Sequence, residues 1–327
     1  MTASDFHHVP VLLAETVEGL NIQPGGVYVD CTAGGGGHSS AIAALLPEGR
    51  LISLDRDPDA VAAASARIGP AAAGQWEVVH APFSELDAVL RERGLEPGSV
   101  QGILADLGVS SHQIDTAERG FSFAHDGPLD MRMDPSTGES AADLLARIDE
   151  RDLVALLFAN DEGRARRIAR AIVAARAEAP LERTAQLADL IESVARRTGR
   201  THPATKTFQA LRIAINAEDD QLARLLDDAV RWLAPGGRLA LITFHSGEDR
   251  PVKRRLARLA VDCLCPPSAP ICQCSWEPQL RLVRRKGWTA GPQELAENPR
   301  ARSARLRVAE RTDHPHQPLP PEVRRAS

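Results

Sequence analysis

The sequence reads Val27-Tyr28-Val29-Asp30-Cys31-Thr32-Ala33-Gly34-Gly35-Gly36-Gly37-His38 and then, a little further on, Leu51-Ile52-Ser53-Leu54-Asp55. An apolar run of β-branched residues that stops at an acid and opens into glycines predicts a buried strand and a loop that a ligand can approach closely. The following helix would point its first backbone N–H groups at that ligand. Asp55 ends the second apolar run, where a carboxylate can accept hydrogen bonds from both hydroxyls of a ribose. The stretch therefore predicts a site for an adenosine derivative.

Two classes of adenosine cofactor fit this arrangement. A dinucleotide fingerprint requires G-x-G-x-x-G, but the frames that start at Gly34 and Gly35 both reach a serine where the third glycine should stand. An acid at the strand end followed by a glycine cluster instead resembles the first motif of class I S-adenosylmethionine-dependent methyltransferases. In that family the loop holds the methionine end of the cofactor and the acid of the second strand holds the ribose. The pattern favours S-adenosylmethionine, and a nicotinamide-dependent oxidoreductase stays as the alternative.

Strand and helix signals alternate over residues 25–110. The predicted strands are Val27–Asp30, Arg50–Asp55, Trp76–His80 and Gly102–Asp106, and the predicted helices between them are Ser39–Leu46, Pro58–Ile68 and Ser84–Arg93. This alternation predicts an α/β fold with a Rossmann-like, doubly wound parallel sheet. A ligand of such a sheet lies at the carboxyl ends of the strands.

The alternation stops near Gln113, and helical periodicity dominates until about Leu233. The sheet signal returns at Leu233–Phe244, where Pro235-Gly236-Gly237 predicts a tight turn between a helix and a strand. We therefore expect a methyltransferase domain in two parts, residues 1–113 and 217–311. An inserted helical substrate domain would span residues 114–216, and the proline-rich residues 312–327 would form a disordered tail.

Composition and charge exclude several classes of protein. Residues 1–10 lack the apolar core of a signal peptide, and no run of 18 apolar residues occurs, so we expect a soluble, cytoplasmic protein without a membrane partner. Five cysteines, four of them close together, do not form the pattern of a secreted disulfide framework. Residues 1–110 carry 5 Arg against 14 Asp and Glu, whereas residues 251–327 carry 15 Lys and Arg against 7 acids. The basic end could meet a polyanion.

Further motifs resemble the bacterial ribosomal RNA small-subunit methyltransferase H family (RsmH, or MraW). In chain order they are His8-Val9-Pro10-Val11-Leu12-Leu13, Asp106-Leu107-Gly108-Val109-Ser110-Ser111, Glu118-Arg119-Gly120-Phe121-Ser122-Phe123, Gly127-Pro128-Leu129-Asp130-Met131-Arg132-Met133-Asp134, His202-Pro203-Ala204-Thr205, Phe208-Gln209-Ala210-Leu211-Arg212, Phe244-His245-Ser246, Glu248-Asp249-Arg250 and Glu297-Asn298-Pro299-Arg300-Ala301-Arg302-Ser303. The resemblance extends from about His7 to Arg311 and includes the strand-end and glycine motifs.

The resemblance implies methyl transfer from S-adenosylmethionine to the exocyclic N4 of a cytidine in the decoding region of 16S rRNA. The partner would be this rRNA within the small ribosomal subunit, and a homodimer is left open. By matching motifs, the implied cofactor contacts are Gly36, Gly37, His38, Asp55, Phe83, Asp106 and Gln113. The alternatives are methylation of another nucleic-acid amino group and a ribosome-assembly factor without catalysis.

Methyl transfer to nitrogen is an in-line displacement, so its catalysis rests mainly on holding the amine and the methyl group in line. The lone pair of cytosine N4 is delocalised into the ring, and an acceptor for one amino hydrogen would help to align it. Asp106 is the candidate for this catalytic role, and the Leu107 carbonyl competes with it. Asp106 could instead bind only the cofactor. His245 is a candidate general base or a structural hydrogen-bonding residue.

Other side chains could contact the RNA. Phe121, Phe123 or Phe244 could stack on an unstacked base, or belong to the core. Three groups of basic residues could contact the phosphates of the RNA. These groups are Lys253/Arg254/Arg255, Arg300/Arg302/Arg305/Arg307 and His202/Lys206/Arg212.

Four late cysteines form the pattern Cys263-x-Cys265-x6-Cys272-x-Cys274. Four thiolates in a short loop could bind zinc, although C-x-C spacing is less usual than C-x-x-C, and free surface thiols are the alternative. No metal is expected to take part in the reaction itself.

Overall fold

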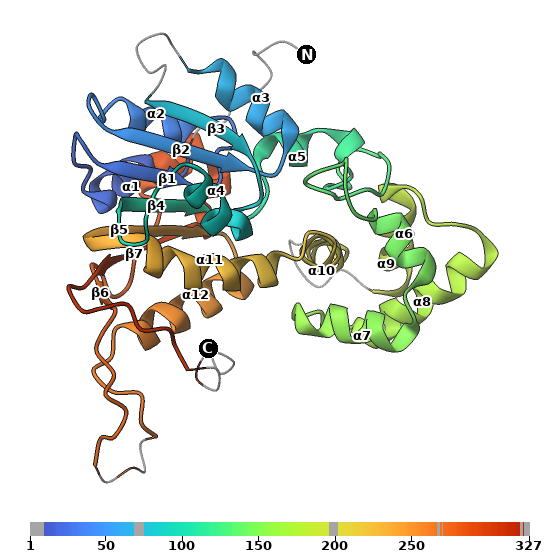
Figure 1. The fold of residues 1–327 in the computed structure, drawn as a ribbon. Helices are drawn as coiled ribbons and strands as arrows, with labels where there is room; N and C mark the ends of the chain where they lie inside the picture. The colour runs from blue at the N-terminus through green and yellow to red at the C-terminus, as the bar shows by residue number, and fades with distance from the viewer. Residues whose placement is uncertain are drawn as a thin grey trace. The chain divides into compact units, whose positions relative to one another are not determined.

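The computed structural model describes residues 10–68, 75–195, 202–266, 269, 271–320 and 323. The first residues of the His8–Leu13 motif and residues 321, 322 and 324–327 of the predicted tail lie outside this description. The chain divides into two compact units, which are Met1–Gly108 with Gln221–Ser327, and Val109–Asp220. The predicted boundaries of the inserted helical domain are residues 114 and 216. Each unit is described by itself below (Figure 1).

The first unit is built on a sheet of seven strands in the order β3-β2-β1-β4-β5-β7-β6. The strands are β1 Val27–Asp30, β2 Arg50–Asp55, β3 Trp76–His80, β4 Val100–Asp106, β5 Leu233–Thr243, β6 Leu280–Leu282 and β7 Arg305–Arg311. Pairing is parallel from β3 through β5, and β7 runs antiparallel to both β5 and β6. The predicted doubly wound α/β sheet is confirmed, with β1, β2 and β3 at the predicted bounds.

Alternate residues of the central strands enter two different cores, as the pleat of a strand requires. On one face Val29, Ile52 and Ile103 pack against helices α4 (Leu86–Glu92), α11 (Glu218–Trp232) and α12 (Ser246–Leu259). On the other face Tyr28 and Leu51 pack with residues of other helices. These helices are α1 (Leu13–Leu20), α2 (Gly37–Ala43), α3 (Pro58–Ala66) and α13 (Pro292–Glu297). Burial on both faces explains why the strands are nearly continuous apolar runs.

Two predicted features of this unit differ in the structure. The predicted turn at Pro235-Gly236-Gly237 lies inside the bounds of β5 and not before the strand, at the point where the pairing with β4 jumps from Val100–Leu233 to Gly102–Arg238. The extra residues are accommodated as an irregularity of the strand, with Gly236 at a φ of 78°. Residues 312–320 of the predicted disordered tail are packed. Leu319 is buried in the core, and Gln317 N–H donates to Gln279 Oε1 at 2.8 Å, so one apolar side chain and a few hydrogen bonds hold an extended proline-rich segment.

The second unit is helical, with a core of its own. Its helices are α5 Ser111–Asp115, α6 Ala141–Arg147, α7 Glu150–Ala159, α8 Ala165–Glu178, α9 Thr184–Val194 and α10 Thr205–Ile215. Phe121 and Phe123 pack against this core, and the ring of Phe123 lies 4.8 Å from that of Phe208 in an edge-on arrangement. The structure therefore places both rings in core packing, the second of the two interpretations. Within the described residues, every helix is too short or too polar to cross a membrane.

Candidate active site

Three acidic residues stand at the carboxyl ends of adjacent parallel strands. Asp30 ends β1, Asp55 ends β2 and Asp106 ends β4, and β1 pairs with both of the other strands. The order of the sheet reverses at β1, because the chain adds β2 and β3 on one side and β4 on the other. A parallel sheet binds its ligand at such a switch point. The arrangement therefore places these carboxylates on the edge of the sheet where the sequence predicted a ligand.

The glycine loop follows β1 and begins α2 at Gly37, two residues before the predicted start. Gly36 caps the helix with a φ of 75°, which favours glycine. A Cβ on Gly37 would lie 2.4 Å from Pro10 Cγ, and one on Gly36 would lie 3.2 Å from Ala64 Cα. Both glycines are therefore explained by close packing within the protein. Among the described residues, a Cβ at Gly34 would have one neighbour within 4 Å, the Thr32 carbonyl oxygen at 3.9 Å, so Gly34 is the most open of these three positions.

Asp55 holds the glycine loop against the end of β2. Its Oδ2 accepts the Gly34 N–H at 2.8 Å, and its Oδ1 accepts the Asp57 N–H at 2.9 Å. Burial raises the pKa of Asp55 to about 6, and these two backbone N–H donors oppose that rise. Each carboxylate oxygen has a second lone pair. Asp55 can therefore keep both contacts and still accept hydroxyl groups from a ligand.

Asp30 is the final acceptor of a buried chain of hydrogen bonds. Trp76 Nε1 donates to Ser53 Oγ at 2.8 Å, and Ser53 and Ser39 share a hydrogen bond of 2.8 Å. Ser39 Oγ donates to Asp30 Oδ2 at 2.6 Å, and the Thr32 N–H donates to Asp30 Oδ1 at 3.1 Å. Burial raises the pKa of Asp30 to about 7. These contacts give Asp30 a supporting role beneath the loop, and sequence reasoning missed its serine and tryptophan partners.

Asp106 has a less complete environment. Its backbone N–H donates to Thr32 Oγ1 at 2.6 Å, which joins the end of β4 to the start of the glycine loop. Its side chain is 14% exposed, and its Oδ1 is buried without a hydrogen-bond partner among the described residues. Burial raises the pKa of Asp106 well above its usual value, and the charges of Asp30 and Glu248 raise it further. A buried acceptor without a donor is costly. Oδ1 is therefore suited to accept a hydrogen bond from a ligand.

His38 lies beside Asp106 instead of facing solvent. The imidazole is 6% exposed, and its Nε2 faces the Val11 carbonyl oxygen at 3.0 Å. Because a carbonyl can only accept, Nε2 carries a proton. The other nitrogen, Nδ1, lies 3.7 Å from Asp106 Oδ2, which is too long for a hydrogen bond but close enough for an electrostatic interaction. His38 is therefore a buried neighbour of Asp106 and forms an ion pair with it only when the imidazole carries a second proton.

The other two predicted cofactor contacts, Phe83 and Gln113, lie in different units of the chain. Phe83 begins the short 3-10 helix η2 (Phe83–Glu85) after β3 and packs, partly buried, against the core of the first unit. The backbone just before it is tied to β2, because the Ala81 N–H donates to the Asp55 carbonyl oxygen at 2.9 Å. Gln113 belongs to the second unit, where its Oε1 accepts the Ser110 N–H at 3.0 Å in a capping box at the start of α5. Its observed contact is therefore structural.

The start of α12 contains a buried acid that sequence reasoning did not place in the site. Glu248 Oε2 accepts the Phe244 N–H at 3.0 Å, and Glu248 Oε1 lies 2.8 Å from His245 Nε2. His245 Nδ1 accepts the Glu248 N–H at 3.4 Å, so both ring nitrogens of His245 contact its own helix start. These contacts favour the structural interpretation of His245. The only available signal for Glu248 was its place in the Glu248-Asp249-Arg250 motif.

Several arginines that were predicted to contact phosphates are paired with carboxylates of this chain. Arg307 makes two hydrogen bonds to Asp249, at 2.7 and 2.8 Å, and Arg212 makes two to Glu218, at 2.8 and 2.9 Å. Arg255 is buried against Asp227. These three arginines are therefore structural in this chain. The exposed members of the predicted groups are Lys253, Arg254, Lys206, Arg300 and Arg302.

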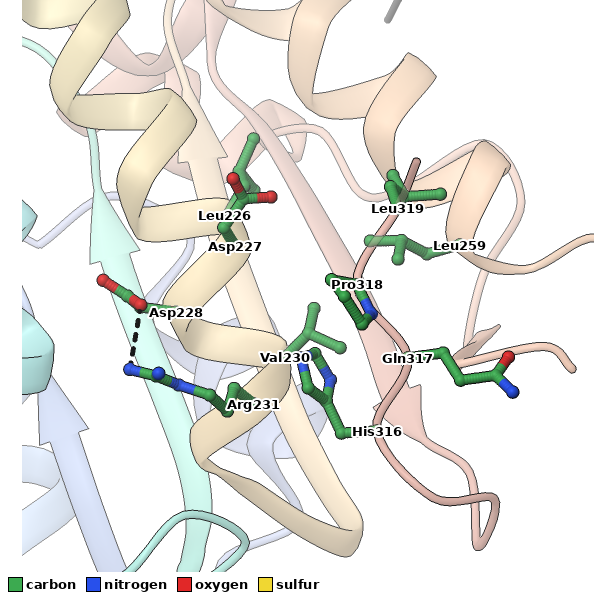
Figure 2. A pocket seen from close by; sticks show the side chains of 10 residues that line it. All are labelled: Leu226, Asp227, Asp228, Val230, Arg231, Leu259, His316, Gln317, Pro318 and Leu319. Carbon is green, nitrogen blue, oxygen red and sulfur yellow. Dashed lines mark hydrogen bonds and ion pairs between the residues drawn. The ribbon is translucent and has the colours of Figure 1, made fainter. Parts of the chain in front are cut away.

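A pocket of the first unit lies away from the strand-end acids (Figure 2). It is lined by α11, the end of α12 and residues 316–319, including Val230, Leu259 and Leu319. The end of α11 leads directly into β5, whose first residue pairs with the first residue of β4. The pocket therefore lies toward the amino ends of the strands. One wall of the pocket is formed by residues 316–319, which belong to the segment predicted to be disordered.

Comparison with known proteins decides the family. The MraW methylase family matches residues 5–312. The chain belongs to this family. It is 48% identical over 312 residues to a ribosomal RNA small subunit methyltransferase H of Geobacter sp. (strain M21), covering 94% of this chain and 99% of the relative. It is 50% identical over 312 residues to the protein of the same name from Geobacter sulfurreducens, again covering 94% and 99%.

A solved structure of a SAM-dependent O-methyltransferase from Thermotoga maritima aligns with 96% of this chain and 71% of its own chain, with a TM-score of 0.40 and 9% identity. Family membership makes this chain a methyltransferase with a Rossmann-like sheet.

Proposed function

We propose that this chain transfers a methyl group from S-adenosylmethionine to the exocyclic N4 of a cytidine in the decoding region of 16S rRNA. Support for the substrate comes from its relatives, which are named small-subunit rRNA methyltransferases and align with nearly its whole length. The observation that carries the reaction is Asp106, whose buried Oδ1 lacks a donor among the described residues at the end of β4. An amine is the kind of group that would satisfy it.

The cofactor would lie along the carboxyl ends of β1, β2 and β4. Asp55 would accept the ribose hydroxyls with its remaining lone pairs, and Phe83 would lie against the adenine. The loop from Gly34 to His38 would hold the methionine end, and Gly34 is more open than Gly36 or Gly37. S-adenosylmethionine supplies, when bound, a methyl carbon on a cationic sulfonium, which suits an edge rich in carboxylates. Gln113 remains a prediction from family resemblance.

Asp106 would orient the target amine. Its Oδ1 can accept one amino hydrogen whether or not Oδ2 carries a proton, because a neutral carboxyl keeps an acceptor oxygen. That hydrogen bond would turn the nitrogen lone pair toward the methyl carbon. The Leu107 carbonyl remains the competing acceptor. Its residue is held in place, since the Leu107 N–H donates to the Ile242 carbonyl oxygen at 2.9 Å.

Exposed basic residues of the first unit would contact the rRNA backbone. Lys253 and Arg254 lie on α12, and Arg300 and Arg302 lie in the 3-10 helix η4 (Pro299–Ser303). Such contacts are electrostatic and weaken as salt is raised. We propose the 16S rRNA within the small ribosomal subunit as the partner, which implies action in the cytoplasm.

The test is a transfer assay on isolated small subunits from a strain that lacks the corresponding enzyme. The purified chain and S-adenosylmethionine with a labelled methyl group are added, and the nucleosides are separated and identified by mass spectrometry. N4-methylcytidine at one decoding-region position supports the proposal. Label on another amino group favours the broader nucleic-acid methyltransferase, and normal subunit binding without label favours an assembly factor. Either result would overturn the proposed reaction.

A further inference from the structure

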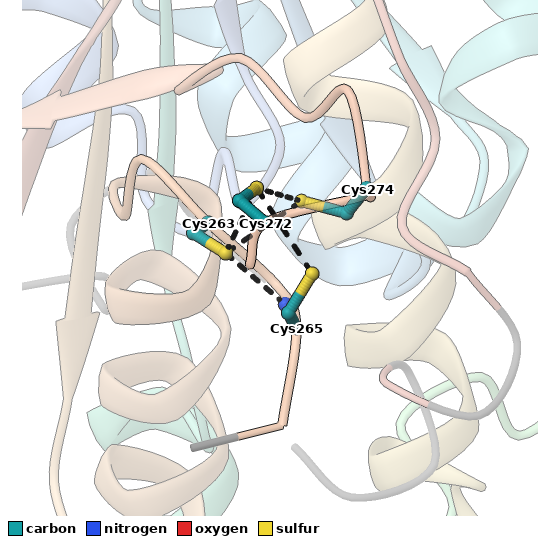
Figure 3. A group of neighbouring side chains, drawn as sticks. All are labelled: Cys263, Cys265, Cys272 and Cys274. Atoms are coloured by element: carbon teal, nitrogen blue, oxygen red, sulfur yellow. Dashed lines mark hydrogen bonds between the residues drawn. The ribbon is translucent and has the colours of Figure 1, made fainter. Parts of the chain in front are cut away.

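Four cysteines converge in the loop between α12 and β6, residues 260–279, here named the cysteine loop. Figure 3 shows that their sulfurs point toward one another. They are Cys263, Cys265, Cys272 and Cys274, and the ligand atoms all lie within 4.8 Å of one another. Cys272 Sγ lies 3.4 Å from Cys263 Sγ, 3.5 Å from Cys274 Sγ and 4.0 Å from Cys265 Sγ. Cys263 and Cys274 are 3.7 Å apart.

Four of the six sulfur–sulfur separations, at 3.4 to 4.0 Å, are close to the edges of a tetrahedron around one metal ion, and the other two are no longer than 4.8 Å. Zinc binds thiolate sulfur at about 2.3 Å, which sets sulfur–sulfur edges of about 3.8 Å. Burial in an apolar core does not explain why the four cysteines lie together, because Cys263 and Cys272 are exposed. Sulfurs this close leave space for a single ion and not for an iron–sulfur cluster. We propose that the cysteine loop binds one Zn²⁺ through these four thiolates.

Backbone donors support the thiolates. The Cys265 N–H donates to Cys263 Sγ at 3.3 Å, and the Gln273 N–H donates to Cys265 Sγ at 3.4 Å. The Leu264 N–H donates to Cys274 Sγ at 3.4 Å. Hydrogen bonds from outside the ligand set orient the ligands of a metal and offset the charge of its thiolates. Three of the four sulfurs, those of Cys263, Cys265 and Cys274, therefore already accept a backbone hydrogen bond.

The site is structural and independent of methyl transfer. Four protein ligands complete the tetrahedron and leave no open position for water or substrate. The base of the cysteine loop is closed separately, because the Gln279 N–H donates to the Leu259 carbonyl oxygen at 2.8 Å and Trp276 Nε1 donates to the Val261 carbonyl oxygen at 3.0 Å. These two hydrogen bonds do not involve the four sulfurs, so the base of the loop is closed without the proposed metal.

Metal analysis of the full chain, purified without an affinity tag that binds metal, tests this proposal. Elemental analysis should find about one zinc per chain, released when the thiols are modified. The double variant Cys272→Ser, Cys274→Ser should reduce bound zinc about tenfold or more, since two of four ligands are lost. The matched control is Cys31→Ala, which removes the buried fifth cysteine and should keep the zinc.

Cobalt substitution of the intact chain provides a second measurement that does not depend on how the variants fold. Metal-free protein titrated with Co²⁺ should develop the visible bands and thiolate charge-transfer absorption of a tetrahedral thiolate site, and Zn²⁺ should abolish them. A chain that holds no metal after growth with added zinc would overturn the proposal. So would disulfides among the four cysteines, iron in place of zinc, or zinc retained by the double variant.

Discussion

Asp30 and Asp106 end neighbouring parallel strands, yet the two strand ends differ in how completely their carboxylates are bonded. At the end of β1, Ser39 and the Thr32 N–H donate to Asp30. At the end of β4, Asp106 Oδ1 has no donor among the described residues. Burial raises the pKa of both acids. The difference teaches that two acids at equivalent strand ends can differ in how far their hydrogen-bonding capacity is used, and Asp106 is the one with an oxygen left to accept from a ligand.

The largest expected effect is a loss of catalytic activity, which should follow from a change at Asp106 at the end of β4. Asp106→Ala removes both acceptor oxygens from the end of β4, so kcat should fall about a hundredfold as the orientation of the amine is lost. Thermal stability should change little, because Asp106 accepts few hydrogen bonds. Steady-state kinetics on small subunits and a melting curve measure both. Glu92→Gln, which alters a carboxylate 76% exposed on α4, is the control. Undiminished kcat would transfer the orienting role to the Leu107 carbonyl.

The second effect should fall on stability. Asp30→Ala leaves the Ser39 hydroxyl and the Thr32 N–H without their buried acceptor, which costs about 2–3 kcal/mol of the free energy of unfolding. Urea denaturation followed by circular dichroism measures this change. The loss of activity should follow the loss of folded protein. A variant as stable as the parent would show that the hydrogen-bonded chain beneath the loop contributes nothing.

The third effect concerns pH and Asp55. Its pKa is about 6 in the fold, above the usual carboxyl value, so the folded chain binds more protons than the unfolded chain between about pH 4 and 6. Asp55 therefore makes the cofactor-free fold less stable as pH rises through that window. A cationic cofactor prefers the ionised carboxylate, so its affinity should rise about tenfold from pH 5 to 7.

Calorimetric titration with S-adenosylmethionine across this pH range measures the change. Asp55→Asn should bind more weakly and with a flatter profile. Affinity in the parent chain that falls with rising pH would contradict the assigned site.

The smallest effect concerns Ser53, which lies in the hydrogen-bonded chain that ends at Asp30. Ser53→Ala removes the acceptor of the Trp76 indole and the partner of Ser39, which should lower stability by about 1 kcal/mol. The melting temperature should drop by about 2–4 °C. Differential scanning calorimetry measures it, with Ser65→Ala on the exposed side of α3 as control. An equal shift in both variants would mean that the measured loss does not come from the buried chain.

Much of the fold was predictable because its signals are local. The bounds of β2 and β3 followed from apolar runs, and the start of α3 followed from Asp57-Pro58, where Asp57 caps the helix by accepting the Asp59 N–H. The failures involve distant contacts. Nothing local to Leu319 indicates that it is buried, and nothing near Arg307 indicates that Asp249 holds it.

The sequence predicted where several candidate residues lie in the fold, but not which groups they contact. Asp55 and Asp106 lie where the motif implied, at the ends of strands. Gly37 was attributed to the approach of a ligand, whereas its neighbour is Pro10. His38 was matched to the cofactor, whereas its nitrogens face Val11 and Asp106. Roles depend on which groups meet, and these groups come from separate segments.

The sequence by itself determined the order of strand, glycine loop, helix and acid, and with it the methyltransferase class of this chain. Apolar periodicity and glycine conformations act over a few residues, so they can be read directly along the chain. Only the tertiary structure decided that Asp30 accepts a hydrogen bond from Ser39, that Asp106 Oδ1 has no donor among the described residues, and that four cysteine sulfurs lie within 4.8 Å of one another. Hydrogen bonding and metal geometry depend on distances between groups that folding brings together.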